Sequence, residues 1–217
     1  MILCSHDENF AWLNREDDGK TAVKLANPKT AEYQIVRTSL LPGLLKTIRE
    51  NKSVALPLKI FETSDIVLKD ETQERKATNH RRWAAAYYGK TSGFEVVHGL
   101  LDRVLLMLRA AFITHEEGLT GKSVDFEVKQ NPSRVSGYYL EEVKDATFFP
   151  GRGAAIYVRL DGKPTRIGEL GVLHPSVLEK FDLRYVLLIL LSYFYLYLCP
   201  SFFAREIRWL TKTTDCQ

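Results

Sequence analysis

Apolar residues recur at helical spacing in two parts of this 217-residue chain. Between Gly93 and Phe112 they form a wide stripe, made of Val96, Val97, Leu100, Leu101, Val104, Leu105 and Leu108. Glu95, Asp102, Arg103 and Arg109 lie off this stripe, as charged residues do on an amphipathic helix. Leu40, Leu41, Leu44, Leu45 and Ile48 have the same spacing, which predicts a second helix from about Pro42 to Glu50.

Alternating apolar and polar residues predict strands in other segments. One strand runs from Leu58 to Leu68 with a bulge near Thr63–Ser64, and "RWAAAYYGK" (residues 82–90) is a second. The charged segment Glu71–Arg82 is expected to join them as the loop of a long hairpin. "SVDFEVK" (123–129) is a further strand, and residues 154–173 form a hairpin that turns at Asp161–Gly162.

Three shorter elements complete the expected order. A short helix lies around Glu8–Asn14, a strand at Ala22–Ala26 is ended by Asn27–Pro28, and a short helix begins within "HPSVLEKF" (174–181). Because hairpin connections dominate, we expect a mostly antiparallel sheet with helices packed on it. This is an α+β fold.

A run without charged residues extends from Val186 to Ala204. The pattern leaves three explanations open: a membrane anchor, a buried core helix, or sequence that does not belong to the preceding fold. A run of about 20 residues is the lower range for a spanning helix. Since Pro200 is expected to end a helix near Leu198, and the flanking charges set no orientation, a membrane location is not favoured.

Composition indicates a globular protein, with 45% hydrophobic and 26% charged residues. The formal net charge of +3 permits contact with nucleic acid but does not indicate it. Cys4, Cys199 and Cys216 are far apart and odd in number, which argues against a disulfide framework or a zinc site and fits a reducing compartment. Because the N-terminus lacks the features of a secretory signal, a cytoplasmic location is expected.

Common catalytic signatures are absent from the sequence, including the P-loop, the dinucleotide fingerprint, H-E-x-x-H and G-x-S-x-G. Glu95 and His98 lie one helical turn apart, but a metal would need further ligands, so no metal site is expected.

Two turn motifs leave a choice open. Pro150 and Gly151 form a turn before a strand, and Arg152 either holds a carboxylate or phosphate there or is solvated. His174, before Pro175, either polarises a substrate or caps the helix that follows.

The expected hairpin loop is rich in basic residues. Arg75, Lys76, Arg81 and Arg82 either contact RNA phosphates or are simply solvated, as such loops commonly are.

Five stretches together resemble one known family. They are "NPKTAEYQIVRTSLLPGLLKTIREN", "LKIFETSDIVLKD", "GFEVVHGLLDRVL", "FFPGRGAAIYV" and "IGELGVLHPSVLEKFDL". These stretches resemble the C-terminal part of the beta subunit of phenylalanyl-tRNA synthetase, of the archaeal and eukaryotic cytosolic type and closest to plant versions. The resemblance covers about Leu3 to Tyr185.

The resemblance implies a class II aminoacyl-tRNA synthetase-like module, with an antiparallel sheet flanked by helices. In this family the module does no chemistry, because the alpha subunit binds ATP, Mg²⁺ and phenylalanine and charges tRNA(Phe). The beta module pairs with the alpha subunit in an alpha-beta heterotetramer. The chain is therefore expected to hold no cofactor and to meet tRNA through the complex.

The residues agree with this division. A class II ATP site needs an arginine on the hairpin strands and a second in a late glycine-rich motif, which clamp the phosphates. Here only Arg82 lies at the edge of the hairpin, and no such motif follows "GVLHP". We therefore expect no adenylate formation by this chain alone. By the resemblance, the segment that contacts the alpha subunit contains Arg37, Leu40, Leu41, Pro42, Leu44 and Leu45.

The chain is accordingly divided into a lead-in segment (1–20), the catalytic-like module (21–185) and a divergent apolar tail (186–217). A complete beta subunit also has upstream editing and RNA-contacting domains, so a fragment, a truncated gene product or a short isoform is expected. The tail is interpreted as an unspliced intron or an alternative last exon, which would remove the closing strand and add an aggregation-prone segment. Two alternatives stay open: a truncated orphan that is membrane-attached or unstable, and a minor tRNA-binding module.

Overall fold

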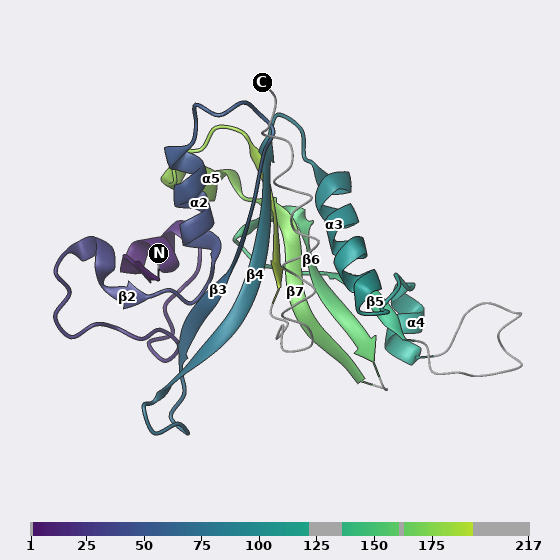
Figure 1. The fold of residues 1–217 in the computed structure, drawn as a ribbon, viewed down its shortest axis with the longest axis horizontal. Coiled ribbons are helices and arrows are strands. Elements are labelled where there is room, and N and C mark those ends of the chain that lie inside the picture. Colours follow the sequence, from purple (N-terminus) through teal and green to yellow (C-terminus); the bar gives the residue numbers. More distant parts are fainter. Residues whose placement is uncertain (1, 122–135, 161–162, 193–217) are drawn as a thin grey trace, which may run out of the picture.

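The computed structural model describes residues 2–121, 136–160 and 163–192. At its centre is a six-stranded sheet in the order β3-β4-β8-β7-β6-β5, in which all neighbours are antiparallel (Figure 1). Its strands are β3 (Leu58–Lys69), β4 (Ala77–Gly89), β5 (Gly137–Glu142), β6 (Phe148–Leu160), β7 (Lys163–Leu173) and β8 (Val186–Ser192). The predicted α+β fold with an antiparallel sheet is confirmed.

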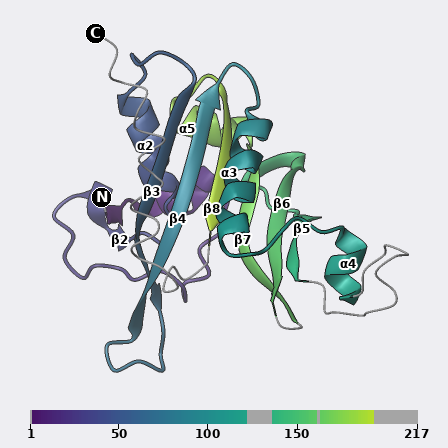
Figure 2. The same cartoon turned by 45° about the vertical axis from the view of Figure 1, so that its right-hand side comes forward.

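Helices cover both faces of this sheet. On one face lie α2 (Leu41–Glu50) and α5 (Pro175–Lys180), and on the other lies α3 (Phe94–Met107) (Figure 1). Figure 2 shows α3 along the face of the sheet, where it packs on β4 and β8. The sheet is therefore the middle layer of three, with a separate apolar core on each side.

Strand β8 is the main departure from the sequence-based expectation. It lies between β4 and β7, with Ile189 opposite Ala86 and Gly171. Leu187, Ile189 and Leu191 face the α2 core, while Leu188 and Leu190 face the α3 core. A strand that is buried on both faces is a continuous apolar run without alternation, which explains the absence of charge.

The predicted boundary at Tyr185 is therefore wrong, since the sheet continues through Ser192. The expected loss of the closing strand is also wrong, because Val186–Ser192 supplies one. Among the described residues, no helix is long and apolar enough to cross a membrane. The remainder of the apolar run lies outside the described residues.

The β3–β4 hairpin is longer and more regular than predicted. Its register runs from Leu58 opposite Tyr88 to Lys69 opposite Ala77 without a shift, so the bulge expected near Thr63–Ser64 is wrong. Residues 77–82, expected in the loop, belong to β4. Hydrogen bonds from Thr72 and Thr78 to Asp70 fix the short loop that remains.

Helix α3 confirms the apolar stripe in part. Val97, Leu101 and Leu105 are buried, whereas Val96 is exposed. Strand β5 and helix α4 (His115–Thr120) follow α3 and were not predicted. The strand predicted at 123–129 lies outside the described residues. The hairpin of β6 and β7 is present, although its turn, Asp161–Gly162, also lies outside them.

The lead-in segment packs on the module. It contains β1 (Leu3–Cys4), α1 (His6–Asn9) and a 3₁₀ turn η1 (Ala11–Leu13), in place of the predicted helix at Glu8–Asn14. Strand β1 pairs with β2 (Ile35–Val36), which follows the turn η2 (Ala31–Tyr33), and the strand predicted at Ala22–Ala26 is a single bridge at Lys24. Leu13 is fully buried in the α2 core, so the first 20 residues share the core of the sheet.

Candidate functional site

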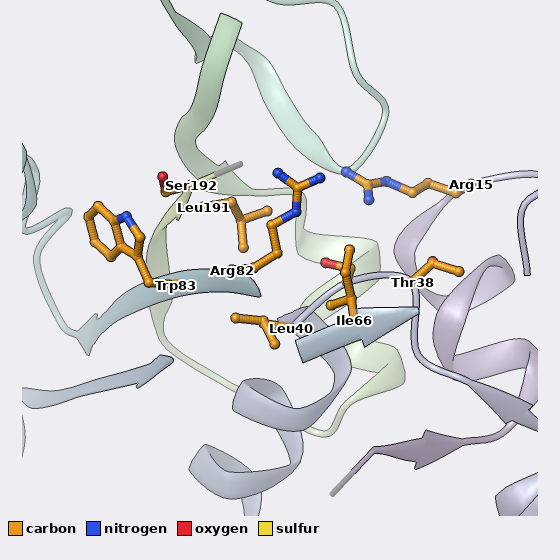
Figure 3. Close-up of a pocket in the computed structure, with 9 residues that line it drawn as sticks. Arg15, Thr38, Leu40, Ile66, Arg82, Trp83, Leu191 and Ser192 are labelled. Carbon is orange, nitrogen blue, oxygen red and sulfur yellow. The ribbon is translucent and has the colours of Figure 1, made fainter. Parts of the chain in front are cut away.

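A cavity of about 100 Å³ lies where the lead-in segment meets β4 and the end of β8 (Figure 3). It is lined by Arg15, Thr38, Ser39, Leu40, Ile66, Arg82, Trp83, Leu191 and Ser192. Figure 3 shows the side chains of Arg15 and Arg82 entering from opposite sides, with their guanidinium groups turned toward each other. We call this space the Arg15–Arg82 cavity.

Strand alternation places Arg82 in this cavity. Ala84 and Ala86 of β4 face the α2 core, and Arg82 lies on the same side because successive side chains of a strand alternate. Its neighbour Arg81 points the other way and pairs with Asp65 of β3, with nitrogen–oxygen distances of 2.5 and 3.2 Å.

Arg15 is held in place by residues that are distant in sequence. Its Nη2 donates to Asp145 Oδ2 at 3.0 Å, and its Nε donates to Thr147 Oγ1 at 3.0 Å. The hydroxyl of Thr147, which is fully buried, donates in turn to the carbonyl of Leu13 at 2.8 Å. Glu169 Oε2 lies 3.6 Å from Arg15 Nη2, and Glu169 Oε1 accepts from Arg166 at 2.6 Å.

The carboxyl of Asp145 is stabilised in its charged form. Burial raises its pKa, but the charge of Arg15 and hydrogen bonds from Thr147 and Arg15 act in the opposite direction, so that the pKa lies below the ordinary value. The Asp145–Arg15 pair therefore contributes to folding stability at neutral pH.

We expect Asp145→Asn to lower the free energy of unfolding at neutral pH by about 1.5 kcal/mol, the value of a hydrogen bond to a charged group. Because the pKa is lower in the folded state, the stabilisation is present above the unfolded-state value of about 3.9 and is lost as the pH falls through the folded-state value. Urea unfolding of both chains should thus differ fully at about pH 6, and the difference should begin to shrink below about pH 4 and vanish only below the lower folded-state pKa. The exposed-site control Asp7→Asn should change little, and a difference that persists in acid would contradict this role.

The residues assigned to an alpha-subunit interface lie inside this chain. Leu40, Leu41, Pro42, Leu44 and Leu45 are buried, and the four leucines belong to the α2 core. Arg37 is only 1% exposed and donates to Glu62 Oε1 at 2.7 Å and to the carbonyl of Asp65 at 3.1 Å. Their side chains are therefore covered by β3, β4 and α5 of the same module, and the burial removes the reason to place them on a partner surface.

The four basic residues proposed for RNA contact do not share one surface. Arg75 and Lys76 are exposed at the tip of the hairpin, which projects beyond the sheet in Figure 1. Arg81 is paired with Asp65 on β3, and Arg82 enters the cavity on the opposite face.

The two turn motifs have structural roles. Pro150, Gly151 and Arg152 lie exposed in an irregular part of β6, where the register shifts and Gly151 has φ +71°. His174 is the N-cap of α5, because its Nδ1 accepts from the backbone N–H of Ser176 at 3.2 Å. The capping alternative is therefore the one the structure favours.

His98 pairs with a different carboxylate from the one considered. Its Nδ1 lies 3.3 Å from Asp102 Oδ2, and Asp102 also accepts the hydroxyl of Tyr138. The ring of His98 stacks on Phe94, with centroids 5.3 Å apart. Among the described residues, no group of three potential ligands that could hold a metal ion occurs.

Sequence reasoning missed most of the cavity. Arg15 lies more than a hundred residues before Asp145 and Glu169 in the sequence. No local spacing therefore signals that these side chains are in contact. Ser192 and Trp83 become neighbours only through the pairing of β4 with β8.

The structure thus defines an α+β module with a small, arginine-lined cavity. Comparison with known proteins identifies it further: a sequence profile described as the phenylalanyl tRNA synthetase beta chain CLM domain matches residues 1–192. The chain belongs to this family of phenylalanyl-tRNA synthetase beta chains.

Named relatives agree with this assignment. The chain is 53% identical over 185 residues to the phenylalanine–tRNA ligase beta subunit of Schizosaccharomyces pombe, which covers 84% of this chain and 29% of that protein. It is 48% identical to the Saccharomyces cerevisiae subunit, over 85% of this chain and 29% of that protein. The Arabidopsis thaliana cytoplasmic subunit is 44% identical, over 84% and 28%.

These comparisons also correct one expectation. A closer likeness to plant versions is not found, since the identity to the fission yeast subunit is higher. The chain spans less than a third of the length of these relatives. The profile match ends at the last residue of β8, in agreement with the boundary that the sheet sets.

Proposed function

We propose that the chain is a non-catalytic module of a phenylalanine–tRNA ligase beta subunit, which pairs with a catalytic alpha subunit. The observation that carries this proposal is the family match across the whole described fold, residues 1–192. The fold we infer is of the class II synthetase type, and an antiparallel sheet between helices is compatible with it. The proposed location is the cytoplasm, by likeness to the Arabidopsis subunit, whose name includes that word.

The Arg15–Arg82 cavity itself is not proposed as an ATP site, because of its size. Sites for small molecules commonly measure about 300–1,000 Å³, whereas the Arg15–Arg82 cavity measures about 100 Å³. Such a space is too small for ATP beside an amino acid. In addition, Asp145 and Glu169 lie beside Arg15 and partly offset its charge. We therefore propose that ATP and Mg²⁺ act in the alpha subunit, that this chain holds no cofactor, and that tRNA(Phe) is bound by the complex.

The test of pairing should use the unmodified chain. Leu44 and Leu45 belong to the segment that the resemblance assigns to the interface, but Leu44→Asp or Leu45→Asp would disturb folding first because both side chains are buried. A loss of co-purification in these variants would not distinguish an interface from a core.

We expect the tagged 217-residue chain to co-purify with its alpha subunit when the two are co-expressed. ATP–pyrophosphate exchange dependent on phenylalanine should be measurable for the purified complex and absent for the tagged chain alone. Exchange by the chain alone would overturn the non-catalytic assignment. Failure to recover the alpha subunit would instead overturn the pairing and favour an orphan protein.

A further inference from the structure

An exposed tyrosine lies among basic side chains at the end of the sheet where β8 begins. Tyr185 directly precedes β8 and is 40% exposed. Lys90, which is also exposed, directly follows β4. Because Gly89 lies opposite Val186 in the antiparallel register, Lys90 and Tyr185 leave the sheet side by side. The tip of the β3–β4 hairpin lies at the opposite end of β4 (Figure 1).

A buried tyrosine holds Tyr185 in place. The hydroxyl of Tyr88 accepts the backbone N–H groups of Arg184 at 3.2 Å and of Tyr185 at 3.4 Å. The rings of Tyr88 and Tyr185 meet edge to face, with centroids 5.7 Å apart and planes at 67°. Such a contact covers at most one face of the exposed ring, so the other face is open to a planar group. Since the backbone is already fixed, binding orders little more of the chain.

Three further cations gather around the acid that lies next to this loop. Asp182 pairs with Lys52. The pKa of Asp182 lies below its ordinary value, because Lys52 donates a hydrogen bond to it and the charges of Lys52, Arg184 and Arg49 favour the carboxylate. Arg49 also pairs with Glu50. Together with Lys90, the cations of this group outnumber its two carboxylates and favour a polyanion as the partner.

We propose that this surface binds single-stranded RNA. It consists of Arg49, Lys52, Lys90, Arg184 and Tyr185, and we call it the Tyr185 platform. A base stacks on the open face of the tyrosine ring while the cations contact the neighbouring phosphates, as in proteins that bind single strands without reading their sequence. The bases of a duplex are already stacked, so the ring favours an unpaired strand. The inference rests on the proposed function only for the identity of the RNA, since tRNA is the RNA that a tRNA ligase subunit would meet.

Fluorescence anisotropy of the full 217-residue chain with a labelled single-stranded RNA of about ten nucleotides tests the stacking. We expect Tyr185→Ala to weaken binding at least about fivefold, because one base loses its aromatic partner. Tyr185→Phe keeps the ring and should bind within about twofold of the native chain. Phe112→Ala, which removes a ring that is 55% exposed beside β5, should also bind within about twofold. Equal binding by the native chain and Tyr185→Ala would overturn the proposal, as would tighter binding of the duplex form of the same RNA.

The salt dependence of binding tests the charged part of the platform. Arg184→Gln removes one phosphate contact, so the slope of the logarithm of the binding constant against the logarithm of the salt concentration should become shallower by about 0.7. Arg75→Gln is the matched control, because Arg75 is exposed at the hairpin tip, at the other end of β4. Its slope should equal that of the native chain. A shallower slope in Arg75→Gln and an unchanged one in Arg184→Gln would place the RNA at the hairpin tip and overturn the platform.

Failure of this inference is distinct from failure of the proposed function. If the native chain binds no RNA, the Tyr185 platform is refuted, whereas co-purification with the alpha subunit is unaffected. Loss of that co-purification in Arg184→Gln, with RNA binding unchanged, would make the surface a protein interface and would also overturn the proposal.

Discussion

Leu190→Asp is expected to unfold the chain. Leu190 is fully buried in β8, between Ala85 of β4 and Leu170 of β7. The substitution removes about 2–3 kcal/mol of apolar burial and leaves a carboxylate without a partner in the core, which costs several kcal/mol more. The sum of at least about 5 kcal/mol approaches the whole stability of a typical domain. Circular dichroism and urea unfolding should show no cooperative native transition.

Leu106→Asp is the matched control, because the same change is made at a leucine that is 55% exposed on α3. Its free energy of unfolding should stay within about 0.5 kcal/mol of that of the native chain. If Leu190→Asp unfolded at the native urea concentration, β8 would not be part of the sheet. The boundary at Tyr185 that the sequence suggested would then be right.

Arg37→Met is expected to destabilise the isolated chain by about 3 kcal/mol, because it breaks an ion pair whose arginine is almost fully buried and whose carboxylate is partly buried. Arg37 Nη1 donates to Glu62 Oε1 at 2.7 Å, and the side chains are 2% and 26% exposed. Methionine fills part of the space of the arginine stem but leaves Glu62 without its cation and the carbonyl of Asp65 without its donor. Urea unfolding in the absence of any alpha subunit measures the loss.

Two further variants establish the cause. Arg37→Met with Glu62→Gln should recover about 1–2 kcal/mol, because no uncompensated carboxylate then remains. Arg81→Met, which breaks an ion pair whose side chains are 52% and 35% exposed, should cost less than about 1 kcal/mol. Unchanged stability of Arg37→Met together with lost binding to the alpha subunit would restore Arg37 to the subunit interface.

Local periodicity predicted those elements in which one face is buried and the other is not. Helices α2 and α3, the β3–β4 hairpin and the β6–β7 hairpin fall in this class. Strand β8 was missed because both of its faces are buried, so it has no alternation to detect. The same apolar run is compatible with a membrane helix, a core helix or a central strand until its neighbours are known.

The resemblance found the right family but not the right environment for individual residues. The resemblance placed Leu44 and Leu45, on the apolar face of a helix, in the segment that contacts the alpha subunit. In the structure this face is buried against the chain's own sheet. An apolar stripe shows that a helix face is covered, but it does not show which chain covers it.

The sequence by itself determined the family, the α+β class and the antiparallel hairpins, because these depend on local spacing and on motifs that neighbouring residues carry. Only the tertiary structure decided that β8 closes the centre of the sheet and that Arg15 faces Arg82. The first feature depends on the pairing of β8 with β4. The second depends on the hydrogen bond from Arg15 to Asp145, a residue more than a hundred positions away in the sequence. The charge-free segment Val186–Ser192 forms a central strand because β4 and β7 lie on either side of it and helices cover both faces of the sheet.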